Sequence, residues 1–226
     1  MAQQLGLNLP GRTARGRDDF FVSPSNRMAL ALIEGWRNWA SGKLVLTGPD
    51  GAGKTHLAHV WAELSGARIV AAASLGLMDV PSLATAPVAV EDVPDIAGDI
   101  TAQTALFHLH NLLLAEGHAL LLTGAGAAAQ WPMTLPDLKS RIQGTTSIAL
   151  EPPDDALLSA VLVKLLADRQ LTPKPDLIPY LLSRMDRSFS AAMNVIDQLD
   201  AASIALKRPV TRHLAAQVLD KPQPDT

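Results

Sequence analysis

A glycine-rich stretch, GPDGAGKT, occupies residues 48–55 of the chain. Its spacing, G-x-x-x-x-G-K-[ST], is typical of loops whose backbone N–H groups surround phosphate oxygens, because glycines allow the turns that point those groups inward. Lys54 can then reach the β- and γ-phosphates of a nucleotide, and the Thr55 hydroxyl can ligate Mg²⁺. The expected nucleotide-contacting residues are Gly48, Pro49, Asp50, Gly51, Ala52, Gly53, Lys54, Thr55 and His56. The pattern predicts a site for ADP or ATP with Mg²⁺.

An acidic pair, Glu91 and Asp92, follows the apolar run VAV. At a strand end beside the phosphate loop, Glu91 would complete the Mg²⁺ shell with Thr55, and Asp92 would orient an attacking water. The alternative is a solvated pair of charges. Thr123, after a run of leucines, is a candidate sensor of the γ-phosphate, although threonine also ends strands for reasons unrelated to function.

A parallel sheet is needed to bring these residues together. Apolar runs predict strands at residues 43–48, 67–73, 86–93, 118–124 and 145–152. Apolar residues recur with helical spacing in the segments 54–64 and 101–117 between them. Strands that alternate with helices favour an α/β fold, a five-stranded parallel sheet flanked by helices.

The pattern changes after Pro152 and Pro153, where every later segment has helical spacing. Asp154 or Asp155 can cap the first of these helices. We therefore expect three parts: a flexible leader over residues 1–19, a nucleotide-binding α/β domain over 20–152, and a small all-helical lid domain over 153–226.

Composition excludes several function classes. The 226 residues contain no cysteine, which excludes disulfides and thiolate metal sites. No apolar run is long enough to span a membrane, and no signal-peptide pattern is present, so a cytoplasmic location without membrane contact is expected. The net charge of −3 and the lack of a long basic run argue against direct sequence-specific DNA binding.

The order of phosphate loop, acidic strand end, polar strand tip and helical lid resembles the AAA+ family of P-loop NTPases. Within it, residues 18–26 (DDFFVSPSN) resemble the segment that contacts the nucleotide base in the DnaA and Hda branch. This resemblance implies a base region at Phe20, Phe21 and Val22. Residues 135–144 (LPDLKSRIQG) resemble the box that carries the arginine finger of that branch, which implies a finger at Arg141.

Residues 186–208 are similar to the lid helix of the Hda family, and the chain ends about one helix later, so no DNA-binding domain like that of DnaA is expected after the lid. Hda proteins also begin with a Gln-Leu-x-Leu-x-Leu segment. This segment docks on the sliding clamp, which is the beta subunit of DNA polymerase III. The stretch QLGLNL matches it, although short leucine-rich motifs also arise by chance. The implied clamp-binding residues are Gln4, Leu5, Leu7 and Leu9.

The resemblance implies negative regulation of replication initiation, in which Arg141 stimulates ATP hydrolysis by DnaA in trans. Three departures favour a nucleotide held as a structural cofactor: the order Glu91–Asp92, Ser190 in place of a lid arginine, and Asp137 in place of a second arginine. The sequence leaves open whether the protein self-associates into a homo-oligomer. The alternatives are a helicase-loader-like AAA+ ATPase and a non-catalytic adaptor between DnaA and the clamp.

Overall fold

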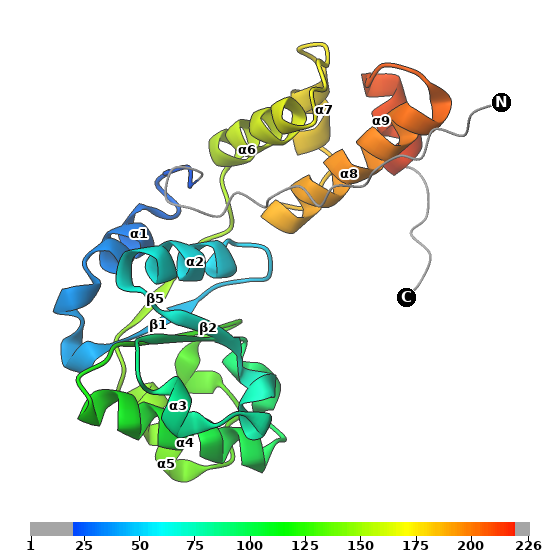
Figure 1. The fold of residues 1–226 in the computed structure, drawn as a ribbon. Helices are drawn as coiled ribbons and strands as arrows, with labels where there is room; N and C mark the ends of the chain where they lie inside the picture. The colour runs from blue at the N-terminus through cyan, green and yellow to red at the C-terminus, as the bar shows by residue number, and fades with distance from the viewer. Residues whose placement is uncertain (1–19, 220–226) are drawn as a thin grey trace.

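A five-stranded parallel sheet organises the first part of the chain in a computed structural model that describes residues 20–219 (Figure 1). Its strand order is β2-β3-β4-β1-β5. The strands are β1 (Lys43–Thr47), β2 (Arg68–Ala71), β3 (Val88–Glu91), β4 (Leu120–Gly124) and β5 (Ser147–Ala149). All pairings are parallel, which confirms the predicted fold class. The carboxyl ends of all five strands therefore lie at one edge of the sheet.

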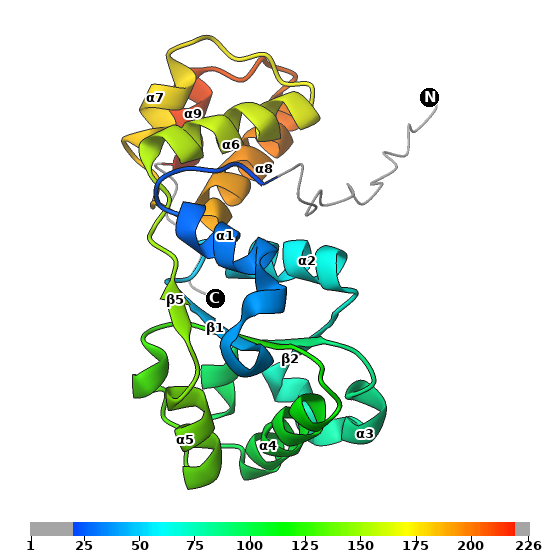
Figure 2. The same cartoon turned by 90° about the vertical axis from the view of Figure 1, so that its left-hand side faces the viewer.

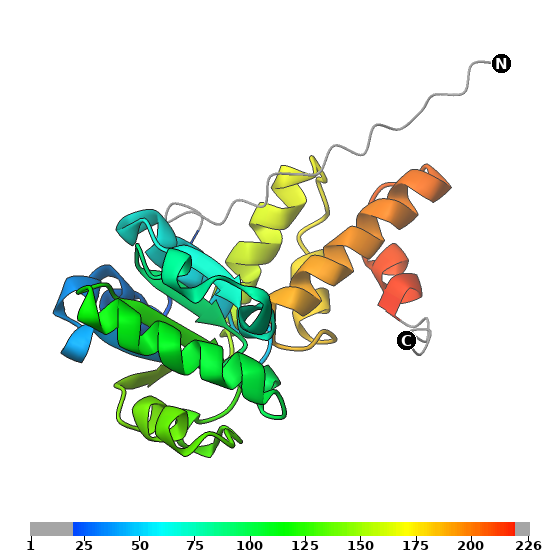
Figure 3. The ribbon, with the colours of Figure 1, turned by 60° about the horizontal axis from the view of Figure 1, so that its bottom comes forward.

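Helices cover both faces of this sheet (Figures 1 and 3). The α-helices before the lid are α1 (Arg27–Glu34), α2 (Lys54–Ser65), α3 (Val80–Leu83), α4 (Ile100–Ala115) and α5 (Pro136–Gln143). The 3-10 segments are η2 (Trp36–Asn38), η3 (Ala40–Gly42), η4 (Ala72–Leu77), η5 (Val93–Ile96) and η6 (Ala128–Gln130). Asp99 caps α4, because its side chain accepts a hydrogen bond from the Ala102 N–H.

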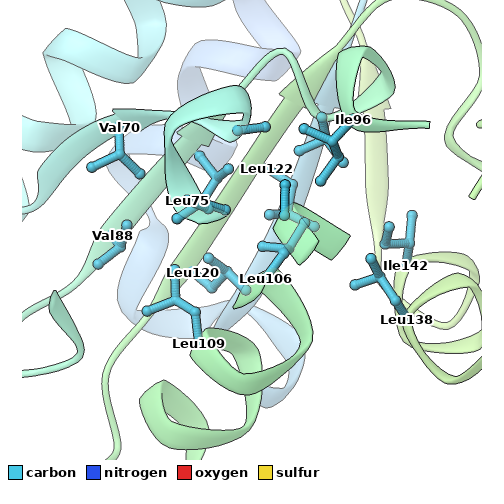
Figure 4. Close-up of a cluster of buried hydrophobic side chains, with 14 of the residues drawn as sticks. Val70, Leu75, Val88, Ile96, Leu106, Leu109, Leu120, Leu122, Leu138 and Ile142 are labelled. Carbon is cyan, nitrogen blue, oxygen red and sulfur yellow. The ribbon is translucent and has the colours of Figure 1, made fainter. Parts of the chain in front are cut away.

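Successive side chains of a strand point to opposite faces of the sheet, so the hydrophobic core is divided between the two faces. Leu44 and Leu46 of β1 pack with α1 and α2, whereas Val45 packs with α4 and α5. Figure 4 shows the cluster on the face covered by α4 and α5. In it, Leu120 and Leu122 of β4 lie near Leu106 and Leu109 of α4. The same alternation directs Lys43, two residues before Val45, toward the face covered by α4 and α5.

Four further helices build the lid region around a separate hydrophobic cluster (Figure 2). They are α6 (Asp155–Asp168), α7 (Leu177–Leu182), α8 (Phe189–Leu206) and α9 (Arg212–Leu219). Asp154 caps α6 by accepting from the Leu157 N–H at 2.8 Å, and Ser188 caps α8 by accepting from the Ala191 N–H at 3.0 Å. Both caps satisfy backbone donors that the first turn of a helix leaves free.

No helix in the described part of the chain combines the length and apolar character that a membrane crossing needs.

Candidate functional site

The phosphate loop connects the carboxyl end of the central strand β1 to the first turn of α2. Gly51 has φ of +70° and Gly53 has φ of +102°, a left-handed backbone region that favours glycine. Gly53 is also the N-cap residue of α2, so the helix N-terminus, with its partial positive charge, points into the loop. Strand, loop and helix N-terminus together form an anion site of the kind that binds phosphate groups.

Lys54 lies buried inside this loop rather than extended into solvent. Its ammonium donates to the carbonyl oxygens of Gly48 at 2.9 Å and Pro49 at 3.0 Å, and lies 3.6 Å from the exposed Asp50 carboxylate. Three acceptors from the loop itself therefore hold the charge. To bind a phosphate, Lys54 must exchange loop carbonyls for phosphate oxygens, which offer a full negative charge in return.

The N-terminus of the lid helix α8 packs directly on the phosphate loop. The Phe189 N–H donates to the Gly51 carbonyl at 2.8 Å. A Cβ at Gly51 would lie 2.5 Å from the Ser190 hydroxyl, and one at Gly53 would lie 3.0 Å from the Phe189 ring. Ser190 therefore lies at the phosphate loop. The resemblance expects an arginine at this lid position, and the serine contributes a hydroxyl there instead of a cation.

The acidic pair lies at the carboxyl end of β3, on the same sheet edge as the phosphate loop. Glu91 has a buried Oε1 atom that has no hydrogen-bond partner among the described residues. Asp92 is exposed, has φ of +55°, and its N–H donates to the buried Thr123 hydroxyl oxygen at 3.4 Å. Thr123 thus joins the tips of β3 and β4.

The donors at this edge fit a magnesium ion. Mg²⁺ prefers oxygen ligands and is usually bound by one or two protein groups together with phosphates and waters. Glu91 supplies a carboxylate with a buried, unpartnered oxygen, and the exposed Thr55 side chain supplies a hydroxyl at the start of α2. No group of three or more His, Asp or Glu able to hold a metal occurs within residues 20–219. Such a site would therefore depend on the phosphates for its remaining ligands.

The predicted base region lies between α2 and the lid. The buried Phe20 ring meets the His56 ring edge-on, with centroids 5.1 Å apart. Phe21 is partly exposed, and the Lys164 ammonium of α6 lies 6.0 Å from its ring centroid. The neighbouring Val22 is 48% exposed, so its side chain remains available for contact.

Asn26 stabilises this segment. Its side chain accepts from the Ser23 N–H at 2.9 Å and donates to the Phe21 carbonyl at 2.8 Å. These local bonds hold the two phenylalanines where the loop meets the lid. The asparagine in SPSN was a signal for this turn, because Asn side chains commonly bond to nearby backbone groups.

Arg141 lies at the opposite end of the sheet from the phosphate loop. It is exposed on α5 and lines a cavity with Lys43, the first residue of β1. Behind Lys43 lies the buried His110 of α4, whose Nε2 is 3.3 Å from the Lys43 ammonium. The structure thus brings three basic side chains from β1, α4 and α5 together.

Burial and nearby positive charge lower the pKa values of Lys43 and His110. Burial, and then the charge of Arg141, lower the pKa of Lys43. For His110, burial is the largest effect and lowers the pKa. The hydrogen bond to Asn111 raises this pKa, whereas the charges of Lys43 and Arg141 lower it further. His110 is therefore neutral at physiological pH.

The sequence analysis did not identify Lys43 or His110 as site residues, nor Phe189 as a contact of the phosphate loop. The sequence does contain a signal for Lys43. It is a lysine at the start of an apolar strand, and a charge on the sheet face covered by α4 and α5 needs a partner. The expected clamp-binding residues Gln4, Leu5, Leu7 and Leu9 lie outside the described residues.

Comparison with known proteins confirms the expected resemblance. Residues 155–219 match the family model of the Hda lid domain. Domain III of DnaA from Thermotoga maritima is similar over 95% of this chain and 100% of its own, with a TM-score of 0.78 and 19% identity. The AMPPCP-bound DnaA from Aquifex aeolicus is similar over 83% of this chain, with a TM-score of 0.69 and 18% identity. This chain spans 65% of that DnaA.

The branch migration motor RuvB of Thermotoga maritima has the same fold, with a TM-score of 0.69 and 14% identity over 91% of this chain and 71% of its own. The identities are low, so these structures establish the AAA+ fold alone. The lid match adds a link to the Hda family.

Proposed function

We propose that this chain, which carries an Hda lid domain over residues 155–219, is a bacterial regulator that stimulates ATP hydrolysis by DnaA and so limits the initiation of replication. The placement of Arg141 is the observation that carries the proposal. β1 has five residues, and at ~3.3 Å per residue it separates the Arg141 cavity from the phosphate loop by roughly 16 Å. Arg141 therefore suits a nucleotide held by another molecule.

In this proposal, the chain also binds a nucleotide of its own, separate from the nucleotide that Arg141 would contact in DnaA. Gly51, Gly53 and Lys54 would hold the phosphates of ADP or ATP, and Phe20 and Phe21 would lie beside the base. Thr55 and Glu91 would ligate Mg²⁺, which supplies positive charge between the phosphates and the carboxylate. The direct contact of α8 with the phosphate loop supports a nucleotide that couples the lid to the sheet.

In trans, the Arg141 guanidinium would neutralise charge that develops on the phosphoryl group transferred in DnaA. Arginine fingers accelerate phosphoryl transfer by ~10³–10⁵ in other nucleotide hydrolases. The hydrogen-bond fork of arginine matches the phosphate oxygens, which a lysine at the same position would contact only as a point charge.

The sliding clamp would act as a tether in this proposal. Gln4, Leu5, Leu7 and Leu9 would dock on the clamp, and the clamp would raise the local concentration of this chain near DNA-bound DnaA.

The test measures ATP hydrolysis by DnaA with this chain, with DNA-loaded clamp, and with both. Stimulation that requires both components is expected, and Arg141→Ala should abolish it while nucleotide stays bound. Lys139→Ala removes a neighbouring exposed cation from α5 and should preserve the stimulation.

Three outcomes oppose parts of the proposal. Wild-type chain that does not accelerate DnaA contradicts the regulatory function. Full stimulation by the Arg141→Ala variant contradicts the finger and favours an adaptor. Rapid ATP turnover by the isolated chain favours a helicase-loader-like ATPase.

A further inference from the structure

A cavity of about 540 Å³ lies at the amino end of β1, on the sheet face covered by α4 and α5. Its lining residues are Lys43, Phe107, Asp137, Ser140, Arg141 and Gly144. Two cations and one carboxylate therefore face the same space, with a hydroxyl beside them. The cavity lies across the sheet from the phosphate loop and shares no lining residue with it.

The two cations of this cavity are not neutralised within the described part of the chain. Neither Lys43 nor Arg141 takes part in any of the ion pairs found among residues 20–219, and Asp137 is not paired with either. Burial lowers the pKa of Lys43 most, and the repulsive charge of Arg141 lowers it further. Such a pair costs free energy unless an anion binds between the two charges.

His110 keeps Lys43 in place beside Arg141. Its Nδ1 lies 3.3 Å from the Asn111 side-chain oxygen, and its Nε2 lies 3.3 Å from the Lys43 ammonium. A neutral imidazole that donates from Nδ1 to Asn111 leaves Nε2 free to accept from Lys43. His110 is therefore a positioning residue that orients one donor of the ammonium and leaves the others for a ligand.

We propose that this cavity binds a phosphate group, with Arg141 and Lys43 as its two cationic contacts and Ser140 as a hydroxyl donor. Lys43 is thus assigned as a second phosphate-binding residue beside Arg141. The proposal rests on the proposed function only for the source of the phosphate, which would be the nucleotide held by DnaA rather than a free phosphate compound.

The chemistry of the lining favours phosphate over a simple carboxylate. A terminal phosphate carries up to two negative charges and three acceptor oxygens, which matches two cations and a hydroxyl. A single carboxylate, Asp137, already lines the cavity without pairing with either cation. The volume of about 540 Å³ also exceeds what one carboxylate fills, and leaves room for more than one phosphate group.

The test uses tripolyphosphate as the probe and the full chain with Lys54→Ala, which weakens the phosphate loop. Calorimetric titration should show one binding site, and adding Lys43→Met should weaken it about tenfold or more, as expected when one charge-assisted bond is lost. Adding Lys139→Met, which removes an exposed cation from the same helix as Arg141, should leave the affinity unchanged.

Two further readouts remain valid if the Lys54 variant does not fold. In wild-type chain saturated with ADP, tripolyphosphate should shift the imidazole nuclear resonance signals of His110. Lys43→Met alone should leave the melting temperature unchanged or raise it, because it removes a cation that Arg141 repels. A purely structural Lys43 would instead lower the melting temperature when replaced.

The outcomes separate this inference from the proposed function. If tripolyphosphate does not bind, or binds equally well to the Lys43→Met chain, the cavity assignment is overturned even when DnaA is still stimulated. If Lys43-dependent binding occurs without stimulation of DnaA, the proposed function fails and the cavity takes a free phosphate compound. If Lys43→Met also reduces the stimulation about tenfold, the nucleotide of DnaA is the source.

Discussion

His110 is a buried, neutral imidazole placed behind a lysine. Only 3% of its surface is exposed, so protonation would add a charge in a poorly solvated position beside Lys43 and Arg141. The same protonation would remove the acceptor that orients Lys43. A fall in pH should therefore affect both the fold and the proposed phosphate-binding cavity through His110.

The stability of the protein should fall as the pH decreases through 6.5, the ordinary pKa of histidine. The folded pKa of His110 is lowered, so the unfolded chain binds more protons below that pH and the free energy of unfolding decreases. One such proton gives a slope of at most about 1.4 kcal/mol per pH unit. Urea unfolding between pH 7.5 and 5 measures it.

His110→Leu should reduce this slope, because the titrating group is gone. His108→Gln is the matched control, since His108 is exposed on the same helix and its replacement should preserve the slope. Equal slopes in the wild type and the His110→Leu variant would show that His110 does not titrate with folding.

At the scale of elements, the contact between α8 and the phosphate loop joins the lid to the sheet. It depends on glycines, because Phe189 and Ser190 approach where a Cβ would stand. The lid helix begins at this contact, capped by Ser188. The contact would therefore couple the proposed nucleotide binding to the position of the lid through one short stretch of backbone.

Gly51→Ala should weaken nucleotide binding about tenfold or more, because the added methyl group forces the loop and α8 apart. Gly66→Ala is a matched control. Both glycines have nearly the same φ, +70° and +72°, so both variants carry a backbone strain of about 1 kcal/mol. A Cβ at Gly66 meets nothing within 4 Å.

Nucleotide affinity by calorimetry and melting temperature distinguish the two glycine variants. We expect both variants to lose a similar amount of melting temperature. Only the Gly51 variant should lose nucleotide affinity. Equal affinities would mean that the lid contact does not influence the site.

At the scale of the molecule, the phosphate loop, the lid and the cavity beside Lys43 lie within the described residues, whereas the proposed clamp contact lies outside them. Replacing Gln4, Leu7 and Leu9 together by alanine should abolish clamp binding in a pull-down and leave the nucleotide affinity unchanged, because the expected phosphate loop is a separate segment, residues 48–55. The control is Gln3→Ala with Asn8→Ala, which changes the residue before the motif and an unspecified position inside it, and it should keep the binding. Loss of folding in the triple variant would assign the leucines to the core.

Local patterns were sufficient for much of the fold. Each strand forms within an apolar run read from the sequence, and Asp154 caps α6 as its position before an apolar segment predicts. The short helices α1 and α3 were not predicted, because eight and four residues give too few turns for a clear period. The match to the Hda lid also follows from sequence alone.

The phosphate loop was determined by the sequence itself, because strand, glycines, lysine and helix are consecutive. The cluster of Lys43, His110 and Arg141 was decided only by tertiary structure. Lys43 and His110 are 67 residues apart, and their contact depends on the register of β1 in the sheet and on how α4 packs across it. The burial that keeps the His110 imidazole neutral is likewise a property of the packed molecule, since an unfolded chain would leave this side chain in water.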